Sequence, residues 1–241
     1  MTKVFRYELR RVLLSRLFFG VLLACLGYGW LTLTAVTIRG AAHTAPFSPW
    51  SFGDYLSRLL PLLCLGELSF VGVFTSRRER RVQPITRASR VDPGRYALIR
   101  WGAVLALTLV LWLGVAALAV GFYAALFGWE DYGALAAPAL LTMVPAAVFC
   151  LGAGWTLGRR SPALVYAAMG AALLLCWLPL PRELAFSPQD FFTQYPMGQE
   201  VLDPAFSVTG RFLLGRAAWT AAGIAPLLGR LLQRRGGLES C

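Results

Sequence analysis

Residues 101–128 read WGAVLALTLVLWLGVAALAVGFYAALFG, a run of 28 residues without a charged side chain. An α-helix needs about 20 mostly apolar residues to cross the hydrocarbon core of a bilayer, so this run can cross it with tilt. Five further apolar stretches lie at 17–38, 59–76, 134–158, 163–180 and 212–232. The sequence therefore predicts an all-α membrane protein with six transmembrane helices, in a single domain over residues 1–241.

The composition excludes an ordinary soluble protein. Apolar residues make up 57% of the chain and charged residues only 15%, with a mean hydropathy of +0.60, whereas soluble domains carry about a quarter charged residues. The longest connection between apolar stretches, residues 181–211, is too short for a catalytic domain. Any energy source or large partner must therefore come from another chain.

The placement of the basic residues predicts the topology. A pI near 10 would fit nucleic-acid binding, but 18 of the 23 Lys and Arg fall on one side if the six helices alternate in direction. That side carries a net charge of +14 and the other side −2. By the positive-inside rule, we expect both termini in the cytoplasm and no nucleic-acid partner. The ratio of 22 Arg to one Lys favours a GC-rich bacterium, and so the bacterial inner membrane.

The chain lacks the residues for common enzyme chemistry. Lys3 is its only lysine, which excludes a Walker A loop, and His43 is its only histidine, which excludes a His-Glu-x-x-His metal site. The five cysteines show no metal-ligand spacing and predict no disulfide framework. We therefore expect no catalytic residues, no metal and no cofactor in this chain, with an intramembrane enzyme as a minor alternative.

The charged lead of residues 1–16 has the pattern of an amphipathic helix. Its apolar positions recur at helical spacing (Phe5, Leu9, Val12, Leu13), and its basic positions form another stripe (Lys3, Arg6, Arg10). Such a helix lies in the membrane interface with its basic side chains among lipid phosphates. The alternative is a basic flank that only sets the orientation of the first span.

Residues 181–211 form the only sizeable segment on the acidic side. The segment is too polar to span a membrane, yet it carries many large apolar side chains. This composition predicts an external hairpin of two short helices tucked partly into the outer leaflet. Phe191, Phe192 and Tyr195 are the candidates for an outward gate or substrate lid; the alternative is a packed cap with no substrate role.

Glu67 lies near the middle of the second apolar stretch. A carboxylate at that depth is costly, so we expect Glu67 to face the protein interior or a subunit seam. Three side chains are candidate partners in this chain: Thr142, Tyr166 and Arg216. Glu67 is then either a polar point on a transport path or a structural tie between two helices.

The segment TSRRERRVQPITRASRVDPGRYALIR (75–100) concentrates eight arginines between the second and third apolar stretches. A basic loop of this kind often only sets topology and contacts lipid headgroups. This one begins with a charged turn at Glu79, permits a short helix from Val82 to Arg90 with Pro84 in its first turn, and breaks at Asp92-Pro93.

This segment resembles the loop of type-2 ABC transporter permeases, which has the form E-R-x-x-G-T-x-x-L-x-x-S-x-P-x-S-R before the third span. Glu79-Arg80 matches the acidic-basic start, Ile85 the apolar position, and Ser89-Arg90 the final step, while Gln83-Pro84 stands in place of the Gly-Thr. The layout is also similar: an amphipathic N-terminal helix, six spans, and a short fifth span before an external hairpin.

The resemblance implies the permease subunit of an ATP-driven bacterial exporter. Such a subunit pairs with a second permease subunit and with two cytoplasmic ATP-binding subunits, which hold the ATP and Mg²⁺. Its loop, here 77–100, docks on the ATPase, and the residues implied in coupling are Glu79, Arg80, Arg87, Ser89 and Arg90. The expected substrate is hydrophobic or amphipathic: a peptide, drug or lipid. The alternatives are a self-contained channel or carrier and an accessory membrane protein.

Overall fold

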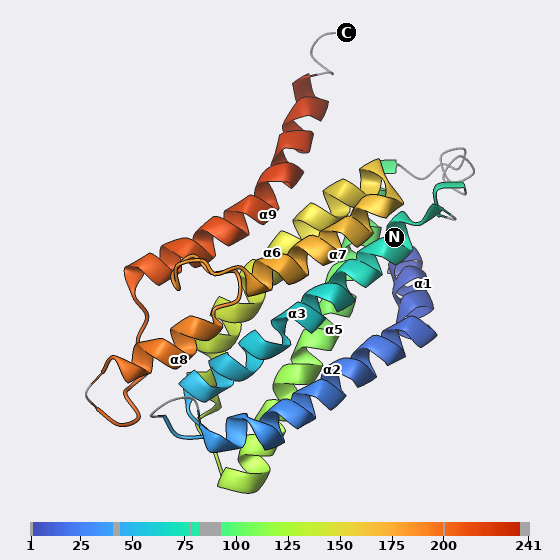
Figure 1. Ribbon diagram of the computed structural model, residues 1–241. Helices are drawn as coiled ribbons and strands as arrows, with labels where there is room; N and C mark the ends of the chain where they lie inside the picture. Colours follow the sequence, from blue (N-terminus) through green and yellow to red (C-terminus); the bar gives the residue numbers. More distant parts are fainter. Residues whose placement is uncertain (1, 41–43, 78, 82–92, 200, 237–241) are drawn as a thin grey trace.

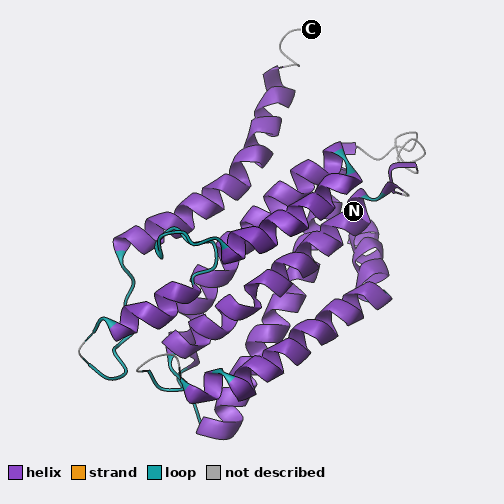
Figure 2. Ribbon diagram, viewed as in Figure 1, coloured by secondary structure: helices purple, strands orange, loops and turns teal. Residues whose placement is uncertain are grey.

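The structure, a computed structural model, describes residues 2–40, 44–77, 79–81, 93–199 and 201–236, and this part of the chain is helical with no strand. Figure 2 shows helices joined by loops, of which the longest in the described chain flank α8. The helices are α1 (Thr2–Leu13), α2 (Arg16–Ala35), the 3₁₀ turn η1 (Thr37–Arg39), α3 (Pro49–Thr75), α5 (Pro93–Phe127), α6 (Tyr132–Arg160), α7 (Pro162–Trp177), α8 (Gln189–Met197) and α9 (Gly210–Gly236).

Helix α3 is the centre of the bundle, since it packs against α2, α5, α6, α7 and α8. Figure 1 shows α1 at the end of the bundle where α3 and α6 finish and α5 and α7 begin. We call this the α1 end. The opposite end, with α8 and the connections between α2 and α3 and between α5 and α6, is the α8 end. Helix α9 runs beside α6 and then leaves the bundle.

Four helical segments of the described chain are long and apolar enough to cross a membrane, which supports the predicted membrane-protein fold. They contain α2, α3, α5 and α6. Helix α7 is apolar but has only 16 residues, about 24 Å against a hydrocarbon core of about 30 Å. Helix α9 contains Pro226 and approaches α6 closely: a Cβ added at Gly152 would lie 1.9 Å from the Gly223 carbonyl oxygen. Small residues therefore let these two helix backbones touch.

Helix α3 begins ten residues before the predicted stretch at 59–76. The hydroxyl of Ser48 caps it by accepting from the Ser51 amide at 3.1 Å, and Pro49 occupies its first turn. The polar residues that interrupt the hydropathy pattern are paired within the helix, with Arg58 Nε 2.8 Å from Asp54 Oδ2. This ion pair allows α3 to continue through polar residues at which the hydropathy pattern predicts the helix to begin.

In residues 181–211, the described chain contains one short helix, α8, where the sequence predicts a pair. Side chains from the bundle hold the rest of the segment in place. The guanidinium of Arg216, which is 3% exposed, donates to the carbonyls of Ala185 and Phe186, the latter at 3.0 Å. The Trp50 indole donates to the Pro204 carbonyl at 2.8 Å. These bonds satisfy backbone groups that a second helix would otherwise have satisfied.

The lead folds as helix α1, and its apolar face packs on the bundle, while its predicted placement in the membrane interface stays a prediction. Val12 is 2% exposed, and Phe5, Leu9 and Leu13 pack against the core formed with α2 and α5. The helix ends at Leu13, and Ser15 caps the start of α2 by accepting from the Phe18 amide at 3.2 Å. This turn folds α1 back against the start of α5.

Candidate functional site

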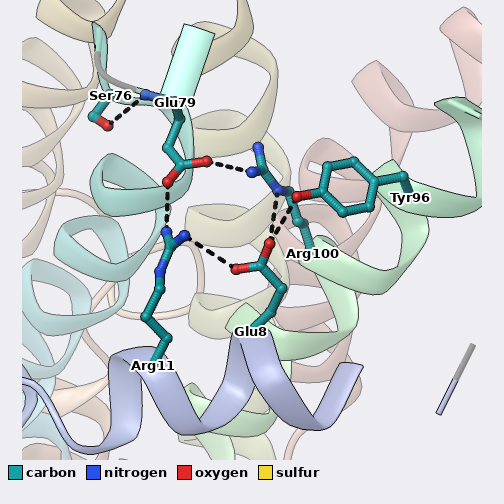
Figure 3. A network of polar contacts seen from close by, with 6 residues as sticks. All are labelled: Glu8, Arg11, Ser76, Glu79, Tyr96 and Arg100. Atoms are coloured by element: carbon teal, nitrogen blue, oxygen red, sulfur yellow. Dashed lines mark hydrogen bonds and ion pairs between the residues drawn. The ribbon is translucent and has the colours of Figure 1, made fainter. Parts of the chain in front are cut away.

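The α1 end brings together charged side chains from three parts of the chain. Glu8 and Arg11 come from α1, Tyr96 and Arg100 from the first turns of α5, and Glu79 from the helical residues that follow α3. The Glu79 amide is held by the Ser76 hydroxyl, which accepts from it at 3.4 Å. Figure 3 shows the side chains converging on one another. Of the residues singled out by sequence, Glu79 is the one at the centre of this site.

Four of these side chains form a closed ring of alternating charge, which we call the charge ring: Glu79, Arg11, Glu8 and Arg100 (Figure 3). Arg11 Nη2 donates to Glu79 Oε1 at 2.6 Å, and Arg11 Nη1 lies 3.5 Å from Glu8 Oε2. Arg100 Nη2 donates to Glu79 Oε2, and Arg100 Nε lies 3.6 Å from Glu8 Oε1. Each carboxylate thus faces two guanidinium groups.

Two of the ring members are buried, and a fifth residue supports them. Glu8 is 3% exposed and Arg100 is 7% exposed. The Tyr96 hydroxyl donates to Glu8 Oε1 at 2.7 Å, and the Arg100 guanidinium lies 4.5 Å from the centre of the Tyr96 ring. Two acids and two bases leave the ring neutral, so charges that would be costly to bury singly compensate one another.

Arg11 stays charged in this setting. Partial burial lowers the pKa of its guanidinium, but the hydrogen bond to Glu79 and the charges of Glu8 and Glu79 together raise that pKa above its ordinary value. The ring therefore ties α1, the end of α3 and the start of α5 by charge-assisted hydrogen bonds, which are stronger than neutral ones.

Arg80 extends the site to a fourth helix. Its guanidinium donates to the carbonyls of Gly158 at 2.5 Å and Arg160 at 3.3 Å, in the last turn of α6. These carbonyls have no partner within the helix, and the C-terminal end of a helix carries partial negative charge. Glu79 and Arg80, adjacent in sequence, therefore connect the end of α3 to α1, α5 and α6.

The predicted short helix from Val82 to Arg90, with Arg87, Ser89 and Arg90, lies outside the described residues. The described chain resumes at Pro93, in the first turn of α5, so residues 93–100 belong to that helix. The structure therefore places Glu79 and Arg80 of the five predicted coupling residues directly before this segment.

The sequence analysis did not single out Glu8, Arg11, Tyr96 or Arg100. Only Glu8 carries a local signal, because it is the one acid in the lead and shares a helix face with Phe5 and Val12. An acid on an apolar helix face needs a buried partner. The identity of that partner depends on how α1 folds back, which periodicity does not reveal.

Glu67 is fully buried within the chain, as expected for an acid that faces the protein interior. Its side chain lies near Cys150 of α6, and neither carboxylate oxygen has a hydrogen-bond partner among the described residues. The predicted partners do not reach it. Thr142 precedes Cys150 by eight residues, about 12 Å along α6; Tyr166 is 72% exposed, and Arg216 is engaged at the α8 end.

The proposed gate residues lie in an aromatic cluster at the α8 end. Phe191 and Phe192 of α8 are at most 1% exposed, and Phe191 stacks on Phe212 of α9 with ring centres 3.8 Å apart. Tyr195 is half-buried and stacks on Trp50 of α3 at 5.5 Å. In this arrangement α8 packs on α3 and its aromatic side chains contact α9, as those of a packed cap would.

Within the described ranges, no group of three or more His, Cys, Asp or Glu side chains is arranged to hold a metal ion. In comparisons with protein-family models, curated proteins and solved structures, nothing matches this chain.

Proposed function

We propose that this chain is the permease subunit of a bacterial ATP-driven ABC transporter of the type-2 class. In this proposal α2, α3, α5, α6, α7 and α9 are the six spans, both termini are cytoplasmic, and the α1 end faces the cytoplasm. The protein pairs with a second permease subunit and with ATP-binding subunits in trans, and it exports a hydrophobic or amphipathic substrate.

The observation that carries the proposal is the position of Glu79 and Arg80. They lie at the end of α3, directly before the basic segment that resembles the ATPase-docking loop of these permeases. Glu79 bonds Arg11 of α1 and Arg100 of α5, and Arg80 bonds the last turn of α6. A displacement of the loop would therefore act on four helices at once.

The charge ring is suited to transmit such a displacement because it is multiply bonded and two of its members, Glu8 and Arg100, are buried. Ion pairs with two contacts per carboxylate resist reorientation better than a single exposed pair, which contributes little. ATP-binding subunits that close on the loop would push on Glu79 and Arg80, and the ring would pass the movement to α1 and α5. Glu79 and Arg80 are positioning residues in this scheme.

A self-contained carrier is the second candidate, and Glu67 is the observation in its favour. A carrier needs polar groups along a path through one protomer. Glu67 is buried in the second half of α3, and its oxygens have no hydrogen-bond partner among the described residues, as expected of a substrate-binding or ion-binding acid in a closed path. The carrier predicts transport that needs no ATP-binding protein.

Co-purification tests the proposal. The affinity-tagged chain is co-expressed with an ATP-binding protein encoded by an adjacent gene, and the membrane fraction is purified in mild detergent. We expect a stable complex whose ATP hydrolysis depends on this chain. Transport by the purified chain alone in proteoliposomes, without any ATP-binding protein, would contradict the permease proposal and support the carrier.

A further inference from the structure

Helix α1 presents a basic face outward after its apolar face has packed on the bundle. Lys3, Arg6 and Arg10 are all exposed on this outer face, and Tyr7, between them, is 67% exposed. Residues three, four and seven positions apart share one helix face, so these side chains line up along α1. We call Lys3, Arg6 and Arg10 the basic stripe.

The stripe has no acidic partner within the described residues. The carboxylates described at the α1 end are Glu8 and Glu79, and both belong to the charge ring, where Arg11 and Arg100 occupy them. Among the described residues, the three positive charges of the stripe are therefore uncompensated. Mutual repulsion along the helix makes an anionic ligand favourable there.

Exposed apolar residues follow the stripe along the chain. Leu14 is 59% exposed, Leu17 41% and Leu23 74%, and Arg16 between the first two is exposed as well. Leu17 and Leu23 belong to α2, one of the helices long and apolar enough to cross a membrane. A change from basic to apolar exposed surface over one turn is typical of the boundary between phosphates and acyl chains.

We propose that the basic stripe is a binding site for anionic phospholipid headgroups. Arg6 and Arg10 would hold lipid phosphate oxygens by bidentate hydrogen bonds, Lys3 would add a point charge, and Tyr7 would lie at the interface. Continuity with the exposed leucines favours a lipid over an acidic protein, because a lipid covers both surfaces with one molecule. The proposal requires that α2 crosses a membrane, and it holds for a permease and a carrier alike.

Lipid titration of the purified full-length chain tests this site. The chain is held in non-ionic detergent and titrated with phosphatidylglycerol or phosphatidylcholine, and native mass spectrometry counts the bound lipids. We expect a preference for phosphatidylglycerol that weakens as salt is added. The triple variant Lys3→Gln/Arg6→Gln/Arg10→Gln should bind phosphatidylglycerol about 100-fold more weakly, the loss expected for three basic side chains at an anionic surface.

The α8 end supplies a matched control. Arg39→Gln/Arg182→Gln/Arg211→Gln removes the same charge from three exposed positions there and should leave the affinity unchanged. The variant Lys3→Arg/Arg6→Lys/Arg10→Lys keeps the charges and should retain binding, which separates loss of the site from loss of folding. An unchanged preference for phosphatidylglycerol in the stripe triple variant would overturn the proposal. An acidic protein would then be the alternative ligand of the stripe. An equal loss in both glutamine triple variants would also overturn the proposal, because net charge alone would then explain the binding.

Discussion

At the scale of single residues, the charge ring is the feature with the largest energetic consequence. Glu8→Ala removes a buried carboxylate that faces Arg11 and Arg100 and accepts from Tyr96. Because the buried Arg100 would then lose one of its two carboxylate partners, we expect the free energy of unfolding to fall by about 3 kcal/mol. Denaturant unfolding in detergent micelles measures this change.

Glu130→Ala is the matched control, since Glu130 is exposed in the turn between α5 and α6; it should change stability by no more than about 0.5 kcal/mol. The double variant Glu8→Ala/Arg100→Ala should lose less than the sum of its single variants, because the two residues interact directly. If the losses in free energy of unfolding were additive, Glu8 and Arg100 would not stabilise each other.

Replacement of Glu67 should affect stability in the opposite direction from replacement of Glu8. Its oxygens have no partner among the described residues, so its burial is a cost to the isolated chain. Glu67→Leu should therefore leave the unfolding midpoint of the purified chain unchanged or raise it. A clear loss that Glu67→Gln restores would instead show that the carboxyl makes a hydrogen bond that ties two helices. Normal assembly of Glu67→Gln with lost transport would place the residue on the transport path.

At the scale of elements, α8 packs against α3 and contacts α9. Phe192 is fully buried against α3, where a Cβ added at Gly53 would lie 2.3 Å from the Phe192 ring. Gly53→Ala and Phe192→Ala should each destabilise the protein, the second by about 3 kcal/mol. The double variant should be more stable than the sum of the two losses predicts, because the smaller side chain leaves room for the new methyl group.

The same variants separate a cap from a gate. A packed cap predicts lower protein level and stability with no change in substrate preference in a transport assay. A gate predicts that Phe191→Ala and Tyr195→Ala change the order of preferred substrates while the purified protein stays folded. The burial of Phe191 and Phe192 favours the cap.

The elements were predicted better than their contacts. Apolar runs and caps are local, so the sequence located α2, α5, α6 and the helix in the lead. The start of α3 was missed because hydropathy treats Asp54 and Arg58 as a break, whereas their ion pair neutralises them within the helix. The single helix in 181–211 was missed because aromatic residues fit a packed loop and a helical hairpin equally well.

The candidate site was predicted in part, for a related reason. Glu79 and Arg80 stand out in sequence because they begin a charged segment after an apolar one. Arg11 and Arg100, the partners of Glu79, look like ordinary flanking arginines, which most membrane proteins place at span ends. Their pairing arises only when α1 folds back on α5, a contact between segments far apart in sequence.

At the scale of the whole molecule, the charge asymmetry predicts the orientation. The α1 end carries the excess of arginine, so the C-terminal Cys241, which lies outside the described residues, should be cytoplasmic. A membrane-impermeant maleimide should label Cys241 in lysed cells and not in intact cells. In a Cys241→Ser background, Glu130→Cys should be labelled in intact cells. The reverse pattern would invert the topology.

The central claim is that Glu79 couples this chain to an ATP-binding partner through the charge ring. The most direct measurement is ATP turnover of the purified complex in lipid, with wild type, Glu79→Gln and the exposed control Glu130→Gln compared at equal complex content. We predict that Glu79→Gln leaves the complex assembled and lowers substrate-stimulated ATP turnover at least about tenfold. A tenfold loss corresponds to about 1.4 kcal/mol, the contribution of one charge-assisted contact. Glu130→Gln should behave as wild type. Substrate stimulation of ATP turnover at the wild-type level in the Glu79→Gln complex would contradict the claim. The charge ring would then only stabilise the fold.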